Sequence, residues 1–172
     1  EENSRQFKSG EKIPYLGRQY RLKVIKDDSL TDCSLHFYQG RFTAFVPTTF
    51  TDNDRIQSLN HLFKQWYITM GTKKLKQRLK LYENKLDLSP NQLTVKDQEK
   101  SWGTCTPSGN IYINWRIFTA PMRYVDYILV HELCHLKYMD HSDDFWHLIS
   151  SLLPDYEDRK EWLRIHGPNL KL

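Results

Sequence analysis

The chain has 172 residues, of which 39% are hydrophobic and 27% charged, which is typical of a folded domain with a hydrophobic core and excludes a disordered tail. No apolar run approaches the roughly 20 residues that span a bilayer, so we expect no membrane segment. The net charge of +4 permits anionic partners without requiring them. Three cysteines without paired spacing argue against a disulfide framework, and the first ten residues lack the apolar stretch of a signal peptide, so we expect a cytoplasmic location.

The first 50 residues have the pattern of β structure. Residues 20–24 alternate apolar and basic side chains, which is typical of a half-buried strand. Two further apolar segments, residues 35–38 and 42–46, flank Gln39-Gly40, which predicts a hairpin turn. Pro47 then ends the second of these strands.

A long helical region follows. Thr51, Asp52 and Asn53 are each suitable N-caps, and apolar side chains then recur at three- and four-residue steps. Gly71 interrupts this region, and we interpret it as the residue after a helix end or as a kink. The Ser-Pro-Asn sequence at residues 89–91 ends the helical pattern.

The last 80 residues combine strands with helices. Residues 93–95, 102–105 and 111–115 predict three strands, with strong turn chemistry at residues 106–110. Pro121 predicts the first turn of a helix, and Ser142 is suited to cap another. This order indicates the α+β class, with N-terminal β segments over residues 1–50 and a second domain over residues 51–172.

One motif in the second domain points to metal chemistry. His131-Glu132-Leu133-Cys134-His135 reads H-E-x-x-H and falls inside a predicted helix. Residues at positions i and i+4 share a helix face, so both imidazoles can bind the same zinc ion. Glu132 lies about 100° further round the helix. We therefore expect Glu132 to act as the general base on a metal-bound water, whose pKa zinc lowers to about 7.

Two histidines leave a zinc ion short of ligands, and His141 is the predicted third. The helix must end between His135 and the cap at Ser142, so the turn can bring His141 back over the metal. Asp144, His147 and Glu157 are the next candidates for this place. Three protein ligands and a water form the open coordination of a catalytic site, so we expect one Zn²⁺ per chain.

Several short motifs resemble those of one family: residues 101–105, 109–111, 114–116, 131–137, 140–142 and 145–146. Together they are similar to the YgjP-like metallopeptidases, a family of metal-dependent hydrolases related to the SprT-like and WLM zincins. The resemblance implies a minimal, gluzincin-like α+β fold, with a small, mostly antiparallel sheet packed on the active-site helix and further C-terminal helices. It also implies that His141 is the third ligand and that the N-terminal β segments are the remainder of a longer β region.

Substrate contacts are expected from the segment before the active-site helix. An edge strand commonly binds peptide in zincins, and we expect residues 111–116 to be that strand, with Asn114 or Arg116 contacting the substrate. Trp102 and Trp115 are predicted to lie in the core.

The function predicted from the sequence is a zinc-dependent metallopeptidase acting on a peptide. A nucleoside triphosphate pyrophosphatase, which needs cations such as Arg116 or Lys137 near the metal, and a non-enzymatic, zinc-stabilised binding domain remain open. A basic stretch of the long helix could track phosphates, although a solvated helix face explains it better; its residues are Lys73, Lys74, Lys76, Arg78, Lys80 and Lys85.

Overall fold

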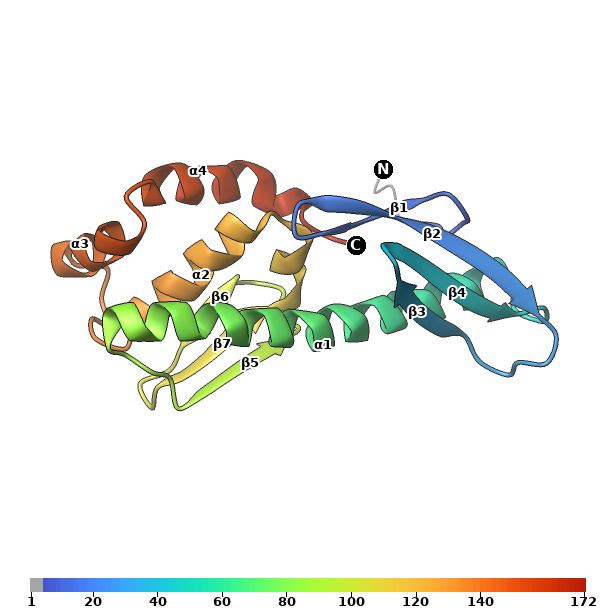
Figure 1. Cartoon of the computed structure of the whole chain (residues 1–172), viewed down its shortest axis with the longest axis horizontal. Helices are drawn as coiled ribbons and strands as arrows, with labels where there is room; N and C mark the ends of the chain where they lie inside the picture. The colour runs from blue at the N-terminus through green and yellow to red at the C-terminus, as the bar shows by residue number, and fades with distance from the viewer. Residues whose placement is uncertain (1–4) are drawn as a thin grey trace. The chain divides into compact units, whose positions relative to one another are not determined.

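The computed structural model describes residues 5–172 and confirms the α+β class. The chain divides into two compact units, and the change between them falls inside helix α1, after Trp66. Figure 1 shows a sheet in each unit and the C-terminal helices in the second. Among the described residues, no helix combines the length and the apolar character needed to cross a membrane. The domain boundary at residue 50 stays a prediction.

The N-terminal unit contains a four-stranded sheet in the order β1-β2-β4-β3. Its strands are β1 (Lys12–Tyr15), β2 (Arg18–Asp27), β3 (Ser34–Tyr38) and β4 (Arg41–Pro47). The β3-β4 hairpin is confirmed, and Gln39 and Gly40 both adopt the positive φ of a tight turn, at 48° and 74°. β2 and β4 are parallel, so the sheet is mixed.

One face of this sheet packs on the beginning of α1 (Asp52–Leu86) through aromatic side chains. Phe42 is fully buried, with its ring centre 5.1 Å from that of Phe63 and 4.7 Å from that of Trp66. Phe7 stacks on Phe63 at 5.3 Å. These contacts place the core of the unit between the sheet and the helix.

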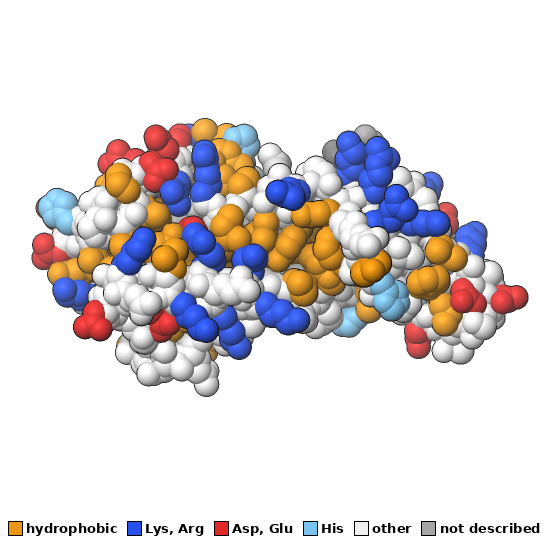
Figure 2. All heavy atoms as spheres, in the orientation of Figure 1, with side chains coloured by type: hydrophobic (Ala, Val, Ile, Leu, Met, Phe, Trp, Pro, Cys, Tyr) orange, Lys and Arg blue, Asp and Glu red, His pale blue; other side chains and the backbone are white. Residues whose placement is uncertain are grey.

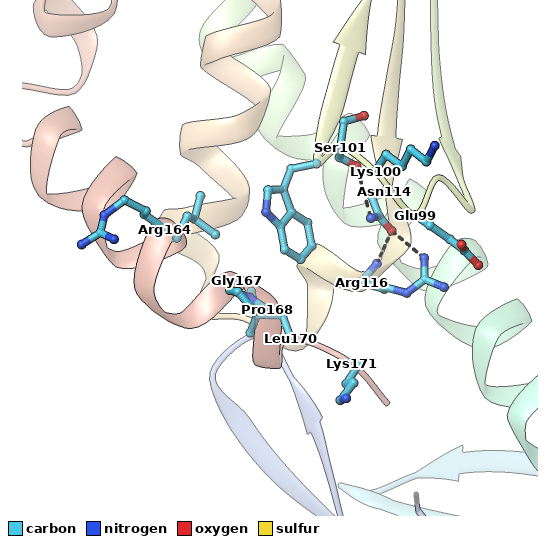
Figure 3. Close-up of a pocket in the computed structure, with 12 residues that line it drawn as sticks. Glu99, Lys100, Ser101, Asn114, Arg116, Arg164, Gly167, Pro168, Leu170 and Lys171 are labelled. Carbon is cyan, nitrogen blue, oxygen red and sulfur yellow. Dashed lines mark hydrogen bonds between the residues drawn. The ribbon is translucent and has the colours of Figure 1, made fainter. Parts of the chain in front are cut away.

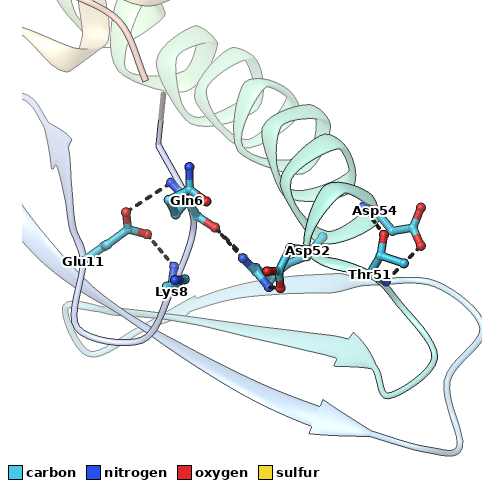
Figure 4. A network of polar contacts seen from close by, with 7 residues as sticks. Gln6, Lys8, Glu11, Thr51, Asp52 and Asp54 are labelled. Carbon is cyan, nitrogen blue, oxygen red and sulfur yellow. Dashed lines mark hydrogen bonds and ion pairs between the residues drawn. The ribbon is translucent and has the colours of Figure 1, made fainter. Parts of the chain in front are cut away.

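Polar contacts fix where α1 begins (Figure 4). Thr51 caps the helix: its hydroxyl accepts the amide of Asp54 at 3.1 Å, and the Asp54 carboxylate accepts the amide of Thr51 at 3.0 Å. Arg55 donates to the carbonyl of Gln6 at 3.0 Å and pairs with Asp52 at 2.7 Å, which ties the N-terminal segment to the helix.

Helix α1 continues for 35 residues, so the prediction that Gly71 ends it is wrong. A Cβ atom at Gly71 would lie 2.3 Å from the ring of Phe118. The glycine is therefore explained by close packing against a distant segment, which the local pattern does not reveal. Asp87, with φ of 54°, follows the last helical residue in the left-handed conformation of a helix end.

The second unit contains a three-stranded sheet in the order β5-β7-β6. Its strands are β5 (Gln92–Lys96), β6 (Gly103–Cys105) and β7 (Asn110–Asn114). β7 pairs in parallel with β5 and antiparallel with β6, so it is the central strand. The expectation that residues 111–116 form an edge strand is therefore wrong. Residues 115 and 116 already belong to the short helix η1 (Trp115–Thr119).

Helix α2 (Met122–Cys134) runs through the core of this unit, followed by α3 (Asp143–Leu152), α4 (Tyr156–His166) and the short helix η2 (Gly167–Asn169). Helix α2 is buried on several sides, and one of its buried residues is Asp126. The side chain of Asp126 accepts hydrogen bonds from Arg78 and Tyr82 of α1. Arg78 is therefore not part of a solvated basic stripe. The pair with Asp126 anchors the second half of α1 to α2.

Candidate metal centre

Helix α2 presents the first two histidines on one face. His131 lies in its last helical turn, and His135 is the C-cap residue with right-handed helical backbone angles, φ of −66° and ψ of −18°. The i, i+4 relation is therefore kept although the helix ends between them, and the two ring centres lie 4.9 Å apart.

The turn after α2 brings His141 to the same place. The candidate ligand atoms of the three histidines all lie within 4.8 Å of one another. Nε2 of His135 and Nε2 of His141 are 3.1 Å apart. Ser142 caps α3 by accepting the amide of Phe145 at 3.3 Å, so the predicted cap is confirmed and His141 lies in the connection between two helices.

Hydrogen bonding and the local electrostatics suit these rings to metal binding. Nδ1 of His135 lies 3.0 Å from the carbonyl oxygen of Tyr138, which can only accept, so Nδ1 carries the proton and Nε2 has a free lone pair. Partial desolvation beside the other two rings lowers the pKa of His141, although the residue is exposed, and the charges of His131 and His135 lower it further. The lowered pKa favours the neutral imidazole, which is the form that binds metals.

The donor set fits zinc. A tetrahedral zinc ion with Zn–N bonds of about 2.0–2.1 Å holds its ligand nitrogens roughly 3.3 Å apart. The 3.1 Å separation between Nε2 of His135 and Nε2 of His141 is close to that value. The three imidazoles could therefore hold a zinc ion.

Aromatic residues of α3 support the cluster. Phe145 is fully buried and stacks on His135 with a centroid distance of 4.4 Å, while its ring also lies 5.1 Å from His131 and 5.0 Å from His141. Trp146 stacks on His141 at 5.6 Å and on Tyr156 at 5.4 Å. Sequence reasoning assigned these aromatics no role at the site, although Phe145-Trp146 is among the motifs of the family resemblance.

Glu132 lies beside the histidine cluster and is only 4% exposed. Its carboxylate oxygen is 2.9 Å from Nδ1 of His131. Gly103 of β6 lies so close that an added Cβ would be 2.9 Å from Cγ of Glu132 and 3.0 Å from its carboxylate oxygen. Sequence reasoning missed this glycine, whose signal is the S-W-G-T-C motif at residues 101–105.

A pocket of about 310 Å³ opens beside the cluster. Its lining includes His131 and Glu132, together with Trp102, Gly103, Tyr127, Ile128, Lys160, Leu163 and Arg164. Burial, followed by the charge of Glu132, raises the pKa of Tyr127 to about 12, so this phenol is neutral near pH 7. The pocket thus combines a buried carboxylate, an apolar floor and two cations of α4.

Asn114 and Arg116 line a neighbouring pocket of about 470 Å³, which shares Trp102 with the first (Figure 3). The amide of Asn114 is buried and donates to the carbonyls of Gln98 at 2.7 Å and Ser101 at 3.2 Å. Arg116 pairs with an aspartate of the same loop, Asp97, at 2.6 Å. The two residues hold the loop that precedes β6, and a substrate contact by either stays a prediction.

The model of the YgjP-like family, described as a metallopeptidase domain, matches residues 1–166. The chain is also similar to the crystal structure of the metallopeptidase zymogen of Pyrococcus abyssi abylysin, with 21% identity and a TM-score of 0.49, over 55% of this chain and 93% of that chain. Among curated proteins, none matches the chain. Because the family model covers nearly the whole sequence, the chain belongs to the YgjP-like metallopeptidase family and is a metal-dependent hydrolase.

Proposed function

We propose that the chain is a zinc-dependent peptidase in which His131, His135 and His141 hold the metal and Glu132 is the general base. The observation that carries this proposal is the convergence of three imidazoles within 4.8 Å next to a pocket that also contains Glu132. Three protein ligands leave one coordination position for a water or substrate, as in catalytic zinc sites.

Each residue then has a defined task. The zinc ion, when bound, supplies a water whose pKa is lowered to about 7. Glu132 would accept a proton from the attacking water and later deliver it to the nitrogen of the leaving group. Its burial and its contacts with His131 and Gly103 hold the carboxylate in one orientation. Lys160 lines the same pocket and would stabilise negative charge that develops on the substrate oxygen.

A purely structural zinc site is less well supported. Structural sites are closed by four protein ligands. Within residues 5–172, the cluster of possible ligands contains the three histidines alone, and the other candidates for the third place, Asp144, His147 and Glu157, are not part of it.

The open edge of β6 supports a peptide substrate. β6 pairs with β7 along one edge, and in the described part of the chain no strand pairs with its other edge. Gly103, its first residue, lines the pocket that contains Glu132. An extended peptide could therefore add to β6 as a further strand and pass the metal centre. This places the proposed peptide-binding edge one strand away from the segment expected from the sequence.

A nucleotide pyrophosphatase remains the second candidate, because Lys160 and Arg164 line the pocket, with Arg164 paired to Glu161 at 2.6 Å. Arg116 and Lys137, the cations proposed from the sequence, do not line it. Phosphoanhydride cleavage would use these two side chains of α4 to neutralise phosphate charge.

The test is a screen of the zinc-loaded protein against a quenched-fluorescence peptide library and a set of nucleoside triphosphates, with Glu132→Gln as the matched variant. We expect peptide hydrolysis by the wild type and a loss of at least about 100-fold in the variant at equal zinc content. Hydrolysis of triphosphates without hydrolysis of peptides would refute the peptidase proposal and support the pyrophosphatase. Equal turnover by both proteins would refute the role of Glu132.

A further inference from the structure

The N-terminal sheet has a second face, which does not pack on α1. Residues that are paired in register across neighbouring strands lie on the same face of a sheet. Lys12 pairs with Arg21, Arg21 with Arg41, and Arg41 with Tyr38, so these four side chains form one row across all four strands. All four are exposed, and Tyr38 is 74% exposed.

The residue that follows each cation of the row has the opposite character, which confirms the assignment of the faces. Ile13, Leu22 and Phe42 each follow a member of the basic row by one residue and are at most 2% exposed. Since side chains alternate along a strand, the basic row points away from the core.

The row concentrates positive charge without compensation. Neighbouring strands lie about 4.8 Å apart, so three cations are aligned within roughly 10 Å, and like charges directly opposite each other destabilise a sheet. Lys23, two residues along β2 from Arg21, adds a fourth cation to the same face. Among the residues that the structure describes, none of these four cations forms an ion pair. Figure 2 shows Lys and Arg side chains gathered over β1 and β2.

The nearest carboxylates are engaged elsewhere. Asp27 lies at the far end of the same face, and its carboxylate accepts the amide of Ser29 at 2.8 Å and its hydroxyl at 2.6 Å. Glu11, immediately before β1, accepts backbone amides of Gln6 and Lys8. Neither carboxylate neutralises the basic row.

Exposed aromatic side chains lie next to the cations, on β3. Tyr38 ends the row, and together with Arg21 and Arg41 it lines a hollow of about 500 Å³. His36 lies two residues away on the same face of β3, with its ring centre 5.7 Å from that of Phe45. The face therefore offers π surfaces at one side and a line of cations at the other.

We propose that this face binds single-stranded nucleic acid, with phosphates on Lys12, Arg21 and Arg41 and a base stacked on Tyr38. Cations that follow the backbone and exposed aromatics that accept bases are the two elements of sequence-tolerant single-strand binding. An acidic protein or an anionic membrane would use the cations but leaves the exposed Tyr38 without a role. The proposal is independent of the hydrolytic function, because it concerns a different unit of the chain.

Fluorescence anisotropy of labelled 15-nucleotide dT and rU strands with the full chain tests the proposal. Three phosphate contacts predict a slope of about −2 for log K against log salt, which is a loss of roughly 18-fold in affinity between 50 and 200 mM salt. The double variant Arg21→Gln, Arg41→Gln should reduce the slope to about −0.7. Tyr38→Ala should weaken binding about tenfold or more with the slope unchanged, because a stacking contact carries no charge.

The control is the double variant Lys73→Gln, Lys76→Gln, which removes the same charge from an exposed part of α1 and should bind like the wild type. Polyglutamate and phosphatidylserine vesicles are the competing probes. Equal affinity for either probe, an unaffected Tyr38→Ala variant, or an equal loss in the control would each overturn the proposal. Thermal melts check that every variant is folded.

Discussion

Replacing Gly103 by alanine adds one methyl group at a crowded point beside Glu132. The backbone tolerates the change, because Gly103 is not in the left-handed region. The new Cβ would lie 2.9 Å from Cγ of Glu132, 3.0 Å from its carboxylate oxygen and 3.0 Å from Cγ2 of Ile128. Ordinary carbon contacts are about 3.5–4.0 Å, so the neighbours must move by roughly 0.5–1 Å.

The substitution should lower both the stability of the fold and the turnover of the enzyme. Overpacking of this kind destabilises a folded core by about 1–3 kcal/mol, which should appear as a lower midpoint of denaturant unfolding. A displacement of a catalytic group by about 1 Å reduces turnover by roughly 100-fold. The histidines are not among the nearest atoms to the added methyl group, so zinc content should stay at about one equivalent. The assays are urea unfolding, metal analysis and hydrolysis of the peptide identified by the library screen.

Gly71→Ala is the matched control, because it also overpacks the second unit but meets Phe118, at 2.3 Å, and not the site. We expect it to lose at least as much stability while its folded fraction keeps normal turnover. If Gly103→Ala retained both wild-type stability and wild-type turnover, the argument that this glycine sets the position of Glu132 would be refuted.

The remaining predictions concern the metal and the pH response. His135→Ala removes the ligand whose tautomer is fixed by the carbonyl of Tyr138, so metal analysis should find little zinc; full occupancy would contradict the site. Chelation should lower the melting temperature without global unfolding, since zinc stabilises only the state that binds it, and hydrogen exchange should increase first in residues 138–142. Global loss of protection would make the metal structural. The raised pKa of Tyr127, about 12 against an ordinary value of 10, favours the protonated phenol in the fold, so its stabilising contribution is complete below pH 10 and lost between pH 10 and 12. Tyr127→Phe should therefore flatten the alkaline decline of stability, and an unchanged decline would argue against this account.

Local patterns predicted the elements that depend on neighbouring residues. The hairpin turn at Gln39-Gly40 could be predicted because both residues adopt positive φ. The cap at Ser142 could be predicted because its hydroxyl can accept a backbone amide of the first helical turn. The H-E-x-x-H spacing predicted that His131 and His135 share a face, because that relation is a property of any helix.

Relations between distant segments could not be predicted in this way. Gly71 reads as a helix end unless the ring of Phe118 is known to lie against it. Arg78 reads as one of several solvated cations until α2 brings Asp126 to it. β6 lies at the edge of the sheet because β5 pairs in parallel with β7, although β6 lies between these two strands in the sequence. The alternation of residues within 111–116 does not reveal which strands pair.

The position of Ser142 directly after His141 has a kinetic consequence for metal exchange. The proposed third ligand directly precedes the N-cap of a ten-residue helix, and the two aromatic side chains against its ring belong to the first turn of that helix. Ends of short helices open far more often than the whole fold does. Zinc would then be released through fraying of α3, while His131 and His135 stay in place on α2. Metal exchange would report the local opening of one helix and would be sensitive to its cap, even at temperatures where the rest of the unit is fully folded.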